Sequence, residues 1–243
     1  MFGACGPSDP KDRIYHLGPI EGTFAVSDFF TPSGHMGDGQ NLGFLHADAQ
    51  LRCKPRPEGA AGYCYNFTYL KRGEFKWAGV YWVYPANNWG SREGIRIKNS
   101  SSFKQVRFKA AASVPVRLQF FYGGITGASG ALPYMDQIRG FGAEDITEDW
   151  KQIHMEILHD ENMPLTNLIG AFGWAIRYPD GEMQSEPHFP DGDKPFNIFI
   201  DDIVWDTDPP PAPKQVTTGT AVDPSRLERE TTSLPGWPLT NRR

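Results

Sequence analysis

Short β-favouring segments, each closed by a turn signal, run through the chain from about residue 14 to residue 207. In the clearest of them, apolar residues take every second position, as Val116, Leu118 and Phe120 do. This period of two sends alternate side chains to opposite faces of a strand, so one face of each segment is buried. No helical segments alternate with the strands in the way that a parallel sheet requires. The pattern therefore predicts an all-β, antiparallel fold.

The number and spacing of these segments predict the architecture. We mark nine of them, at residues 23–26, 63–69, 78–84, 94–97, 105–110, 116–122, 150–157, 168–176 and 196–205. An aromatic content of 13%, with 26 Gly and 21 Pro, is typical of short strands joined by tight turns. A chain of 243 residues has room for one domain of this kind. We therefore predict a two-sheet antiparallel β-sandwich.

Composition changes at both ends of the predicted sandwich, which spans residues 14–207. Residues 1–13 are polar and are expected to form a linker. Residues 208–243 are rich in Pro, Thr and charged residues, so we expect an extended Pro-rich C-terminal tail. The net charge of −5 and the lack of a Lys/Arg run argue against a nucleic-acid partner. No segment approaches the roughly 20 apolar residues of a membrane-spanning helix.

Two of the three cysteines bracket a short loop, CKPRPEGAAGYC. Cys53 and Cys64 can form a disulfide that closes a hairpin, provided that the backbone brings their Cα atoms within about 7 Å. The alternative is two buried free thiols. Zinc is disfavoured, because no second Cys/His pair stands at ligand spacing.

The third cysteine, Cys5, follows Gly3 and Ala4 and precedes a polar stretch. This arrangement resembles the end of a bacterial lipoprotein signal, in which the cysteine carries lipid. It predicts a domain anchored at the periplasmic side of a membrane or at the cell surface, with the lipid as its membrane contact. The alternative is an ordinary cysteine in a frayed terminus.

The segment at residues 77–91, WAGVYWVYPANNWGS, concentrates large aromatic rings. Alternation along the strand places Trp82 and Tyr84 on one face and Tyr81 on the other, and one of these faces must be core. Tryptophan and tyrosine clusters in β-sandwiches are more often core than ligand platform. The alternation divides the cluster but does not tell which face is buried.

A loop follows this strand and carries Asn87, Asn88 and Trp89. The two amides can donate and accept hydrogen bonds beside an exposed ring. Sugar rings present apolar C–H faces and hydroxyls, and their binding sites pair an aromatic platform with planar polar groups. The loop is therefore a candidate carbohydrate contact.

Acidic residues in EDITEDW superficially resemble the carboxylate ladder of laminarinase-type retaining glycosidases. Glu144 and Glu148 have the parity that an acid and a nucleophile need on one strand face. Ile146 and Thr147 replace the expected central pattern, however, and Asp145 faces away. Dispersed histidines and the lack of a G-x-S-x-G or P-loop motif add no other chemistry. We predict a solvated strand entrance and no enzymatic activity.

Other acidic residues lie near the two ends of the predicted domain. Asp28, Asp38 and the pair Asp201-Asp202 would converge if the first and last strands pair. Carboxylates and turn carbonyls are the ligands that calcium prefers. The competing interpretation is that Asp and Gly form tight turns here without an ion.

Six segments in a fixed order resemble a known family. They are VSDFFTPSGHMGDG, GYCYNFTY, WAGVYWVYPANNWGS, DWKQIHMEI, LIGAFGWAI and FNIFIDDIVWD. Together, over residues 20–206, they resemble the galactose-binding-like jelly rolls that include many carbohydrate-binding modules. The segment LIGAFGW departs from the pattern, because Ala171 stands where a second glycine is usual.

The resemblance implies a jelly-roll sandwich without catalytic activity, a glycan or polysaccharide ligand, and a structural calcium that joins the first and last strands. It assigns calcium to Asp28, Asp38 and Asp202. It assigns ligand contacts to Trp82, Tyr84, Asn88, Trp89, Tyr122 and Trp174. A calcium-stabilised carbohydrate-binding domain of the bacterial envelope is therefore the first functional hypothesis. The alternative is a structural or interaction subunit of an envelope complex, which contacts a protein partner through the sandwich and the tail.

Overall fold

The computed structural model describes ten stretches of the chain, which carry eleven strands and short pieces of 3-10 helix but no α-helix. The stretches are residues 20–39, 42–47, 53, 55–56, 58–70, 77–98, 102–126, 134–158, 167–177 and 194–211. The chain divides into two units, residues 1–210 and 211–243, and every strand belongs to the first. Cys5, the predicted linker and nearly all of the predicted tail lie outside the described residues.

One sheet has six strands in the order β3-β4-β11-β6-β9, with β1 paired to β11 beside this path. All the pairings are antiparallel. The strands are β1 (Phe24–Ala25), β3 (Leu42–Ala47), β4 (Cys64–Tyr69), β6 (Gln105–Ala112), β9 (Lys151–Glu156) and β11 (Phe196–Asp206). The first and last strands pair with one another, with Phe24 opposite Trp205.

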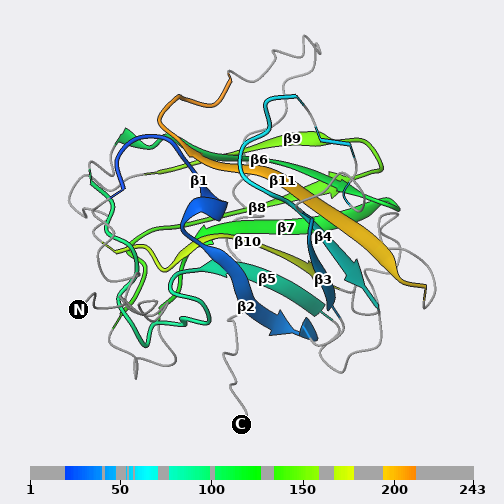
Figure 1. Ribbon diagram of the computed structural model, residues 1–243, viewed down its shortest axis with the longest axis horizontal. Helices are drawn as coiled ribbons and strands as arrows, with labels where there is room; N and C mark the ends of the chain where they lie inside the picture. Colours follow the sequence, from blue (N-terminus) through cyan, green and yellow to red (C-terminus); the bar gives the residue numbers. More distant parts are fainter. Residues whose placement is uncertain are drawn as a thin grey trace, which may run out of the picture. The chain divides into compact units, whose positions relative to one another are not determined.

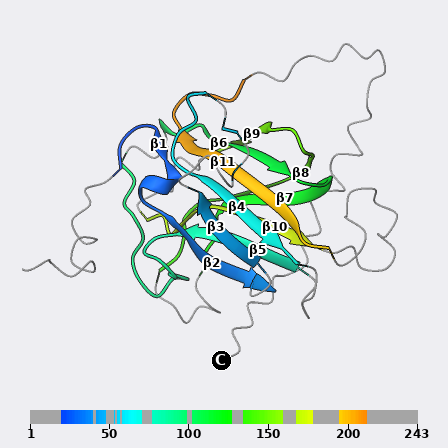
Figure 2. The same cartoon turned by 45° about the vertical axis from the view of Figure 1, so that its right-hand side comes forward.

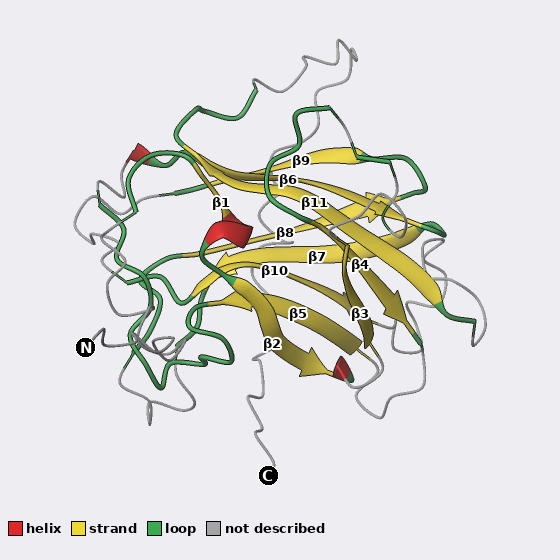
Figure 3. Ribbon diagram, in the orientation of Figure 1, coloured by secondary structure: helices red, strands yellow, loops and turns green. Residues whose placement is uncertain are grey.

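The other sheet has five antiparallel strands in the order β2-β5-β10-β7-β8. They are β2 (Thr31–Gly37), β5 (Trp77–Val83), β7 (Val116–Gly123), β8 (Arg139–Ile146) and β10 (Gly170–Arg177). Figure 1 and Figure 2 show the two sheets as two layers, and Figure 3 shows that strands make up most of the described chain. The predicted all-β, two-sheet sandwich is confirmed.

The main core fills the space between the two sheets. Its largest fully buried side chains are aromatic: Trp82, Trp174, Trp205, Tyr69, Tyr122, Phe30, Phe67, Phe103, Phe108, Phe120 and Phe172. The alternation predicted for β7 is confirmed, because Val116, Leu118 and Phe120 all face this core. The indole N–H of Trp205 donates to the carbonyl of Ala171 at 2.9 Å and so ties β11 to the opposite sheet.

Three strands were not predicted, and all of them are sheet edges. β2 and β8 are the two edges of the five-stranded sheet, and β3 is one edge of the six-stranded sheet. β2 contains Pro32 and two glycines, and β8 contains two glycines and three charged residues. Edge strands tolerate such residues because one side of the strand forms no hydrogen bonds with a neighbouring strand. The sequence of an edge strand can therefore lack a clear strand pattern. Residues 94–97, which were predicted as a strand, form only isolated bridges at Ile95 and Ile97.

One turn of 3-10 helix, η2 (Val26–Asp28), carries the chain from β1 in one sheet to β2 in the other. It is the short red turn beside β1 in Figure 3. Val26 is buried in the core, and its carbonyl accepts a hydrogen bond from the N–H of Phe30 at 2.9 Å. Burial of Val26 at the start of the turn and of Phe30 just after it therefore fixes where the chain crosses between sheets.

Candidate functional site

Strand β5 divides its aromatic residues between the two faces of the sheet, as the alternation predicts. Trp82 is fully buried between the sheets, with its ring edge-on to those of Tyr65, Phe67 and Phe172. Tyr81 points to the outer face, where it belongs to a separate hydrophobic cluster. The prediction that Trp82 contacts a ligand is wrong, because no ligand on the surface can reach a ring inside the core.

Burial also excludes two other predicted contacts. Trp174 is completely buried in β10, and Tyr122 is almost completely buried in β7. The hydroxyl of Tyr122 donates to the carbonyl of Glu156 at 2.8 Å, so it serves to link the two sheets. Tyr84 is partly buried and packs edge-on against Phe30 of the core. These rings stabilise the sandwich and do not form a platform.

The loop after β5 is built around Asn88, which is fully buried. Its amide N–H₂ donates to the carbonyls of Tyr84 at 3.0 Å and Arg92 at 2.8 Å. Its oxygen accepts from the backbone N–H groups of Gly90 and Arg92, both at 3.1 Å. The prediction of Asn88 as a ligand contact is wrong, because its hydrogen bonds are spent on the loop itself. Asn87 remains exposed.

Asn88 holds the loop in a shape that places Trp89 over the outer face of the five-stranded sheet. The half-buried Trp89 ring lies edge-on to Tyr81, with centroids 6.1 Å apart. The ring of Tyr81 in turn packs against the ring of Phe121 in β7, with centroids 4.9 Å apart. Phe141 of the edge strand β8 lies directly opposite Phe121 in the ladder. We call these four residues, Trp89, Tyr81, Phe121 and Phe141, the aromatic strip.

The strip is closed in the middle and open at its ends. Tyr81 and Phe121 are only 6% and 7% exposed, whereas Phe141 is 50% exposed and Trp89 is partly exposed. Gly173 of β10 lies between the two middle rings in register, and a Cβ there would overlap the ring of Phe121. Glycine therefore lets the rings lie close against the sheet.

Beside the strip, the same outer face carries a row of small and polar residues. In register across the sheet these are Ala143, Gln119, Ala175, Gly79 and Met36. Two residues further along the ladder, on the same face, Arg117 Nη1 pairs with Asp145 Oδ1 at 3.0 Å. An amide and a paired guanidinium and carboxylate thus stand beside aromatic rings, as carbohydrate sites require.

A buried carboxylate fixes the loops at the end of this face. Asp136 accepts hydrogen bonds from the backbone N–H groups of Ile125 at 3.0 Å, Ile169 at 2.5 Å and Gly170 at 3.2 Å. Burial raises the pKa of Asp136 to about 7, although these N–H groups favour the charged form. The carboxylate therefore ties three chain segments together, and the sequence offered no signal for it.

Two exposed residues beside Asp136 extend the candidate site. Tyr134 and Met135 are 37% and 53% exposed. The N–H of Tyr134 donates to the carbonyl of Gly90 at 3.1 Å, next to Trp89. Asn167 donates to the carbonyl of Met135 at 3.0 Å and holds it from the other side. The open Trp89 end of the strip thus adjoins a second exposed aromatic residue on a fixed loop.

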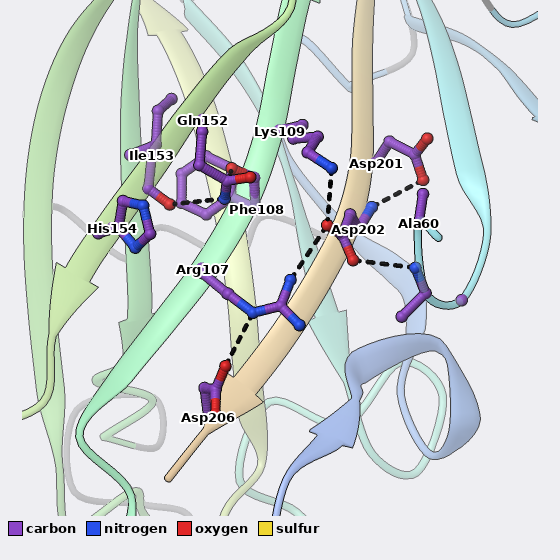
Figure 4. A network of polar contacts seen from close by, with 12 residues as sticks. Ala60, Arg107, Phe108, Lys109, Gln152, Ile153, His154, Asp201, Asp202 and Asp206 are labelled. Atoms are coloured by element: carbon purple, nitrogen blue, oxygen red, sulfur yellow. Dashed lines mark hydrogen bonds and ion pairs between the residues drawn. The ribbon is translucent and has the colours of Figure 1, made fainter. Parts of the chain in front are cut away.

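On the outer face of the six-stranded sheet, Asp202 lies in a polar network (Figure 4). It stands at a bulge of β11 with a φ of 53°, a left-handed backbone conformation that residues other than glycine seldom adopt. Its Oδ2 contacts Arg107 Nη1 at 3.0 Å and Lys109 Nζ at 3.1 Å, and its Oδ1 accepts from the N–H of Ala61 at 2.9 Å. Two side-chain cations and one N–H group therefore already balance this carboxylate.

The neighbouring Asp201 is held by Arg56. Arg56 Nε and Nη2 lie 2.9 and 2.8 Å from the two carboxylate oxygens of Asp201. The same Nη2 also points at three successive carbonyls, those of Ala60, Ala61 and Gly62, at 3.3, 3.2 and 3.0 Å. A disulfide joins Cys53 and Cys64, whose Cα atoms are 6.3 Å apart, and closes the loop that carries Arg56. The guanidinium thus occupies an oxygen-rich position of the kind that a cation would fill.

The predicted calcium ligands do not come together. Asp28 and Asp38 lie beyond opposite ends of β2. The seven residues of this strand span about 23 Å at ~3.3 Å per residue. Asp202 lies in the other sheet and is paired with Arg107 and Lys109. Within the described stretches, no three His, Cys, Asp or Glu side chains form a group that could hold a metal ion. The residues therefore do not fit the predicted calcium.

The two carboxylates considered for catalysis are not arranged as a pair. Glu144 lies in β8 and contacts Lys151 Nζ at 2.7 Å, whereas Glu148 lies in the turn after the strand. Glu144 does line a hollow of about 250 Å³ between β8 and β9, together with His154 and Glu156. Because Glu148 does not lie on the strand, Glu144 and Glu148 do not share a strand face as an acid and a nucleophile would.

No family model and no curated protein matches the chain. Among solved structures, it is similar to a family 11 carbohydrate-binding module of the cellulosomal cellulase Lic26A-Cel5E of Clostridium thermocellum, with 11% identity over 82% of this chain and 94% of that chain and a TM-score of 0.35. A family 30 module is 12% identical over 81% and 87%, with a TM-score of 0.38. The solved structures to which the chain is similar are thus carbohydrate-binding modules, at identities and TM-scores too low to assign it to either family.

Proposed function

We propose that this chain is a non-catalytic domain that binds a carbohydrate on the outer face of its five-stranded sheet. The observation that carries the proposal is the aromatic strip, with its open ends at Trp89 and Phe141. Aromatic rings stack on the apolar faces of sugars, and Gln119 and the Arg117–Asp145 pair stand beside them for hydroxyl groups. The proposal rests on this arrangement and not on the similarity to solved structures.

The length and charge of the site favour a neutral oligosaccharide. The strip extends over β5, β10, β7 and β8, which is about 14 Å at ~4.8 Å per strand spacing. This is longer than one sugar ring, so a chain of sugars fits better than a monosaccharide. Arg117 and Asp145 neutralise one another, so this pair supplies no excess cation that would select an acidic polymer.

The test is affinity electrophoresis of the full chain in gels that contain soluble β-glucans, xylans or mannans, followed by calorimetry with oligosaccharides of increasing length. We expect Phe141→Ala and Trp89→Ala each to weaken binding at least tenfold. Tyr63→Ala is the matched control, because Tyr63 is 40% exposed but precedes β4 in the other sheet. Equal retardation of the wild type and both strip variants, with unchanged melting temperatures, would refute the site.

Location is a separate proposal. We propose attachment to a bacterial envelope through a lipid on Cys5, as the resemblance of residues 3–5 to a lipoprotein signal predicts. Within the described part of the chain, no helix has the length and hydrophobicity needed to cross a membrane. Mass spectrometry of the protein from its native envelope tests the lipid directly, and an unmodified Cys5 would contradict it.

The alternative function, a protein-interaction subunit, depends mainly on the tail at residues 208–243. Nearly all of this segment lies outside the described residues, so the alternative stays a prediction. Deletion of residues 212–243 separates the two functions. Loss of a protein complex with glycan binding intact would assign the interaction to the tail and the carbohydrate to the sandwich.

A further inference from the structure

A hollow of about 610 Å³ lies where β1 and η2 meet β6, β11 and the disulfide-closed loop. Arg107, Val204 and Ala25 line it, and their strand positions alternate with those that face the main core. The hollow therefore opens on the outer face of the six-stranded sheet and is separate from the aromatic strip. Its volume is within the range of about 300–1,000 Å³ that is common for small-molecule sites.

The wall of this hollow is held in place by contacts already made in the fold. The N–H of Ala61 donates to Asp202, and the carbonyls of Ala61 and Gly62 accept from Arg56. Gly62 has a φ of 64°, and a Cβ there would overlap Ser27 Oγ of η2. Only glycine therefore lets the loop approach η2 this closely, and the wall is preformed.

Arg107 offers a hydrogen-bond donor to the hollow. Its Nε lies 2.8 Å from Asp206 Oδ2 and its Nη1 lies 3.0 Å from Asp202 Oδ2, so both contacts fix the guanidinium plane. Figure 4 shows the other terminal nitrogen without a dashed line, and no acceptor for it is found among the described residues. Because two carboxylates offset its charge, Arg107 acts here as an oriented N–H donor and not as an anion trap.

Asp28 and Phe29 supply the complementary groups. The exposed carboxylate of Asp28 makes no hydrogen bond or ion pair with another described residue, so it is available as an acceptor. The half-buried ring of Phe29 also lines the hollow and is held edge-on by Phe24, with centroids 5.6 Å apart. An acceptor, a donor and an aromatic ring thus line one preformed hollow.

The charges that line the hollow select the ligand class. Glu21 is paired with Lys98, and Arg107 is offset by Asp202 and Asp206, so among the described charges that line the hollow Asp28 is the one without an ion pair. This carboxylate would repel an anionic ligand. We infer that the hollow is a second ligand site, which takes a neutral hydroxyl-rich ring such as a terminal hexose. The ring would place its apolar face on Phe29 and its hydroxyls between Asp28 and Arg107.

The test is an amide NMR titration of the full chain with glucose, galactose, mannose and, for comparison, glucuronate, each up to tens of millimolar. We expect shifts at Thr23, Asp28, Ala61 and Gly62 with at least one neutral hexose, and binding of glucuronate at least fivefold weaker. Asp28→Asn should narrow this difference between neutral and acidic sugar to less than twofold. Glu93→Gln, which removes an exposed carboxylate elsewhere, is the matched control.

Two outcomes would overturn this site. The first is the absence of shifts around the hollow with every neutral hexose. The second is glucuronate binding as tightly as the neutral sugars. Trp89→Ala removes the open end of the aromatic strip and should leave these shifts unchanged. The hollow and the strip can therefore succeed or fail independently.

Discussion

Tyr81 and Trp82 are adjacent in β5 and belong to different hydrophobic clusters. Trp82 lies in the main core between the sheets, whereas Tyr81 joins Phe121 on the outer face of the five-stranded sheet. Two neighbouring residues of one strand thus belong to the core and to the candidate ligand surface. Four predictions follow from this division and from the contacts of two buried carboxylates, Asp201 and Asp136.

Substitution of the buried tryptophan should affect stability, and substitution of the loop tryptophan should affect binding. Trp82→Ala removes a fully buried ring that contacts three other rings, so we expect a loss of about 3–5 kcal/mol in the free energy of unfolding. Trp89→Ala should cost clearly less, because Trp89 is partly exposed. Urea denaturation of both variants measures the difference, and equal losses would mean that the two residues are not divided between core and surface.

Gly173→Ala, a substitution in the middle of the five-stranded sheet, should displace the rings of the aromatic strip. The added Cβ would overlap the ring of Phe121, so we expect about 1–3 kcal/mol of destabilisation together with weaker glycan binding. Gly142→Ala is the matched control on β8, because no atom lies within 4 Å of a Cβ at that position. Chemical denaturation and affinity electrophoresis measure the two effects. A Gly173→Ala protein as stable as Gly142→Ala would contradict the close approach of the ring.

Removal of Arg56 should leave the buried carboxylate of Asp201 without its partner cation. Asp201 has a fully buried side chain, whereas that of Arg56 is 33% exposed, so solvent screening reduces the expected loss for Arg56→Met to about 1–3 kcal/mol. Arg96→Met is the control, because Arg96 and Glu93 form an exposed pair at 3.4 Å whose loss should cost less than about 1 kcal/mol. If urea denaturation gave equal losses for the two variants, the Asp201 pair would have no special role.

Asp136 should make stability depend on pH in an unusual direction. Its pKa in the folded protein is about 7, above the value of 3.8 for a free carboxyl, so the folded state holds this proton more tightly than the unfolded state. The stabilisation is complete below about pH 4 and is lost as the pH rises through 7. At ~1.4 kcal/mol per pKa unit, the upper limit is about 4 kcal/mol.

The measurement is the free energy of unfolding of the wild type and of Asp136→Asn at pH 5 and pH 7.5. Asparagine does not titrate, so the wild type should lose more stability than the variant between these two values. Parallel pH profiles for the two proteins would show that Asp136 keeps its ordinary pKa.

The central strands could be predicted from the sequence because burial on one face leaves a clear period of two. Val116, Leu118 and Phe120 illustrate this. The edge strand β2 could not, since Pro32 and its glycines are tolerated only where one side of a strand is unpaired. Alternation also separated Tyr81 from Trp82 but could not say which face is core, because both faces of β5 are apolar.

The candidate site was harder to predict than the fold because its parts lie far apart in the sequence. Phe141, Phe121 and Tyr81 meet only through ladder pairing and packing on one sheet, and none of them has a sequence motif. Asp202 shows the opposite problem. Its position matched the acid expected in the closing strand, but the cations that balance it, Arg107 and Lys109, come from β6.

The Arg56–Asp201 contact also determines which solution conditions this part of the sheet tolerates. A chelator can extract a metal ion from its oxygen ligands, but it cannot extract a guanidinium that is covalently part of the chain. Arginine stays protonated through the physiological range, and the hydrogen bonds to Asp201 raise the pKa of Arg56 further. The loop that walls the hollow should therefore keep its position in surroundings poor in divalent ions.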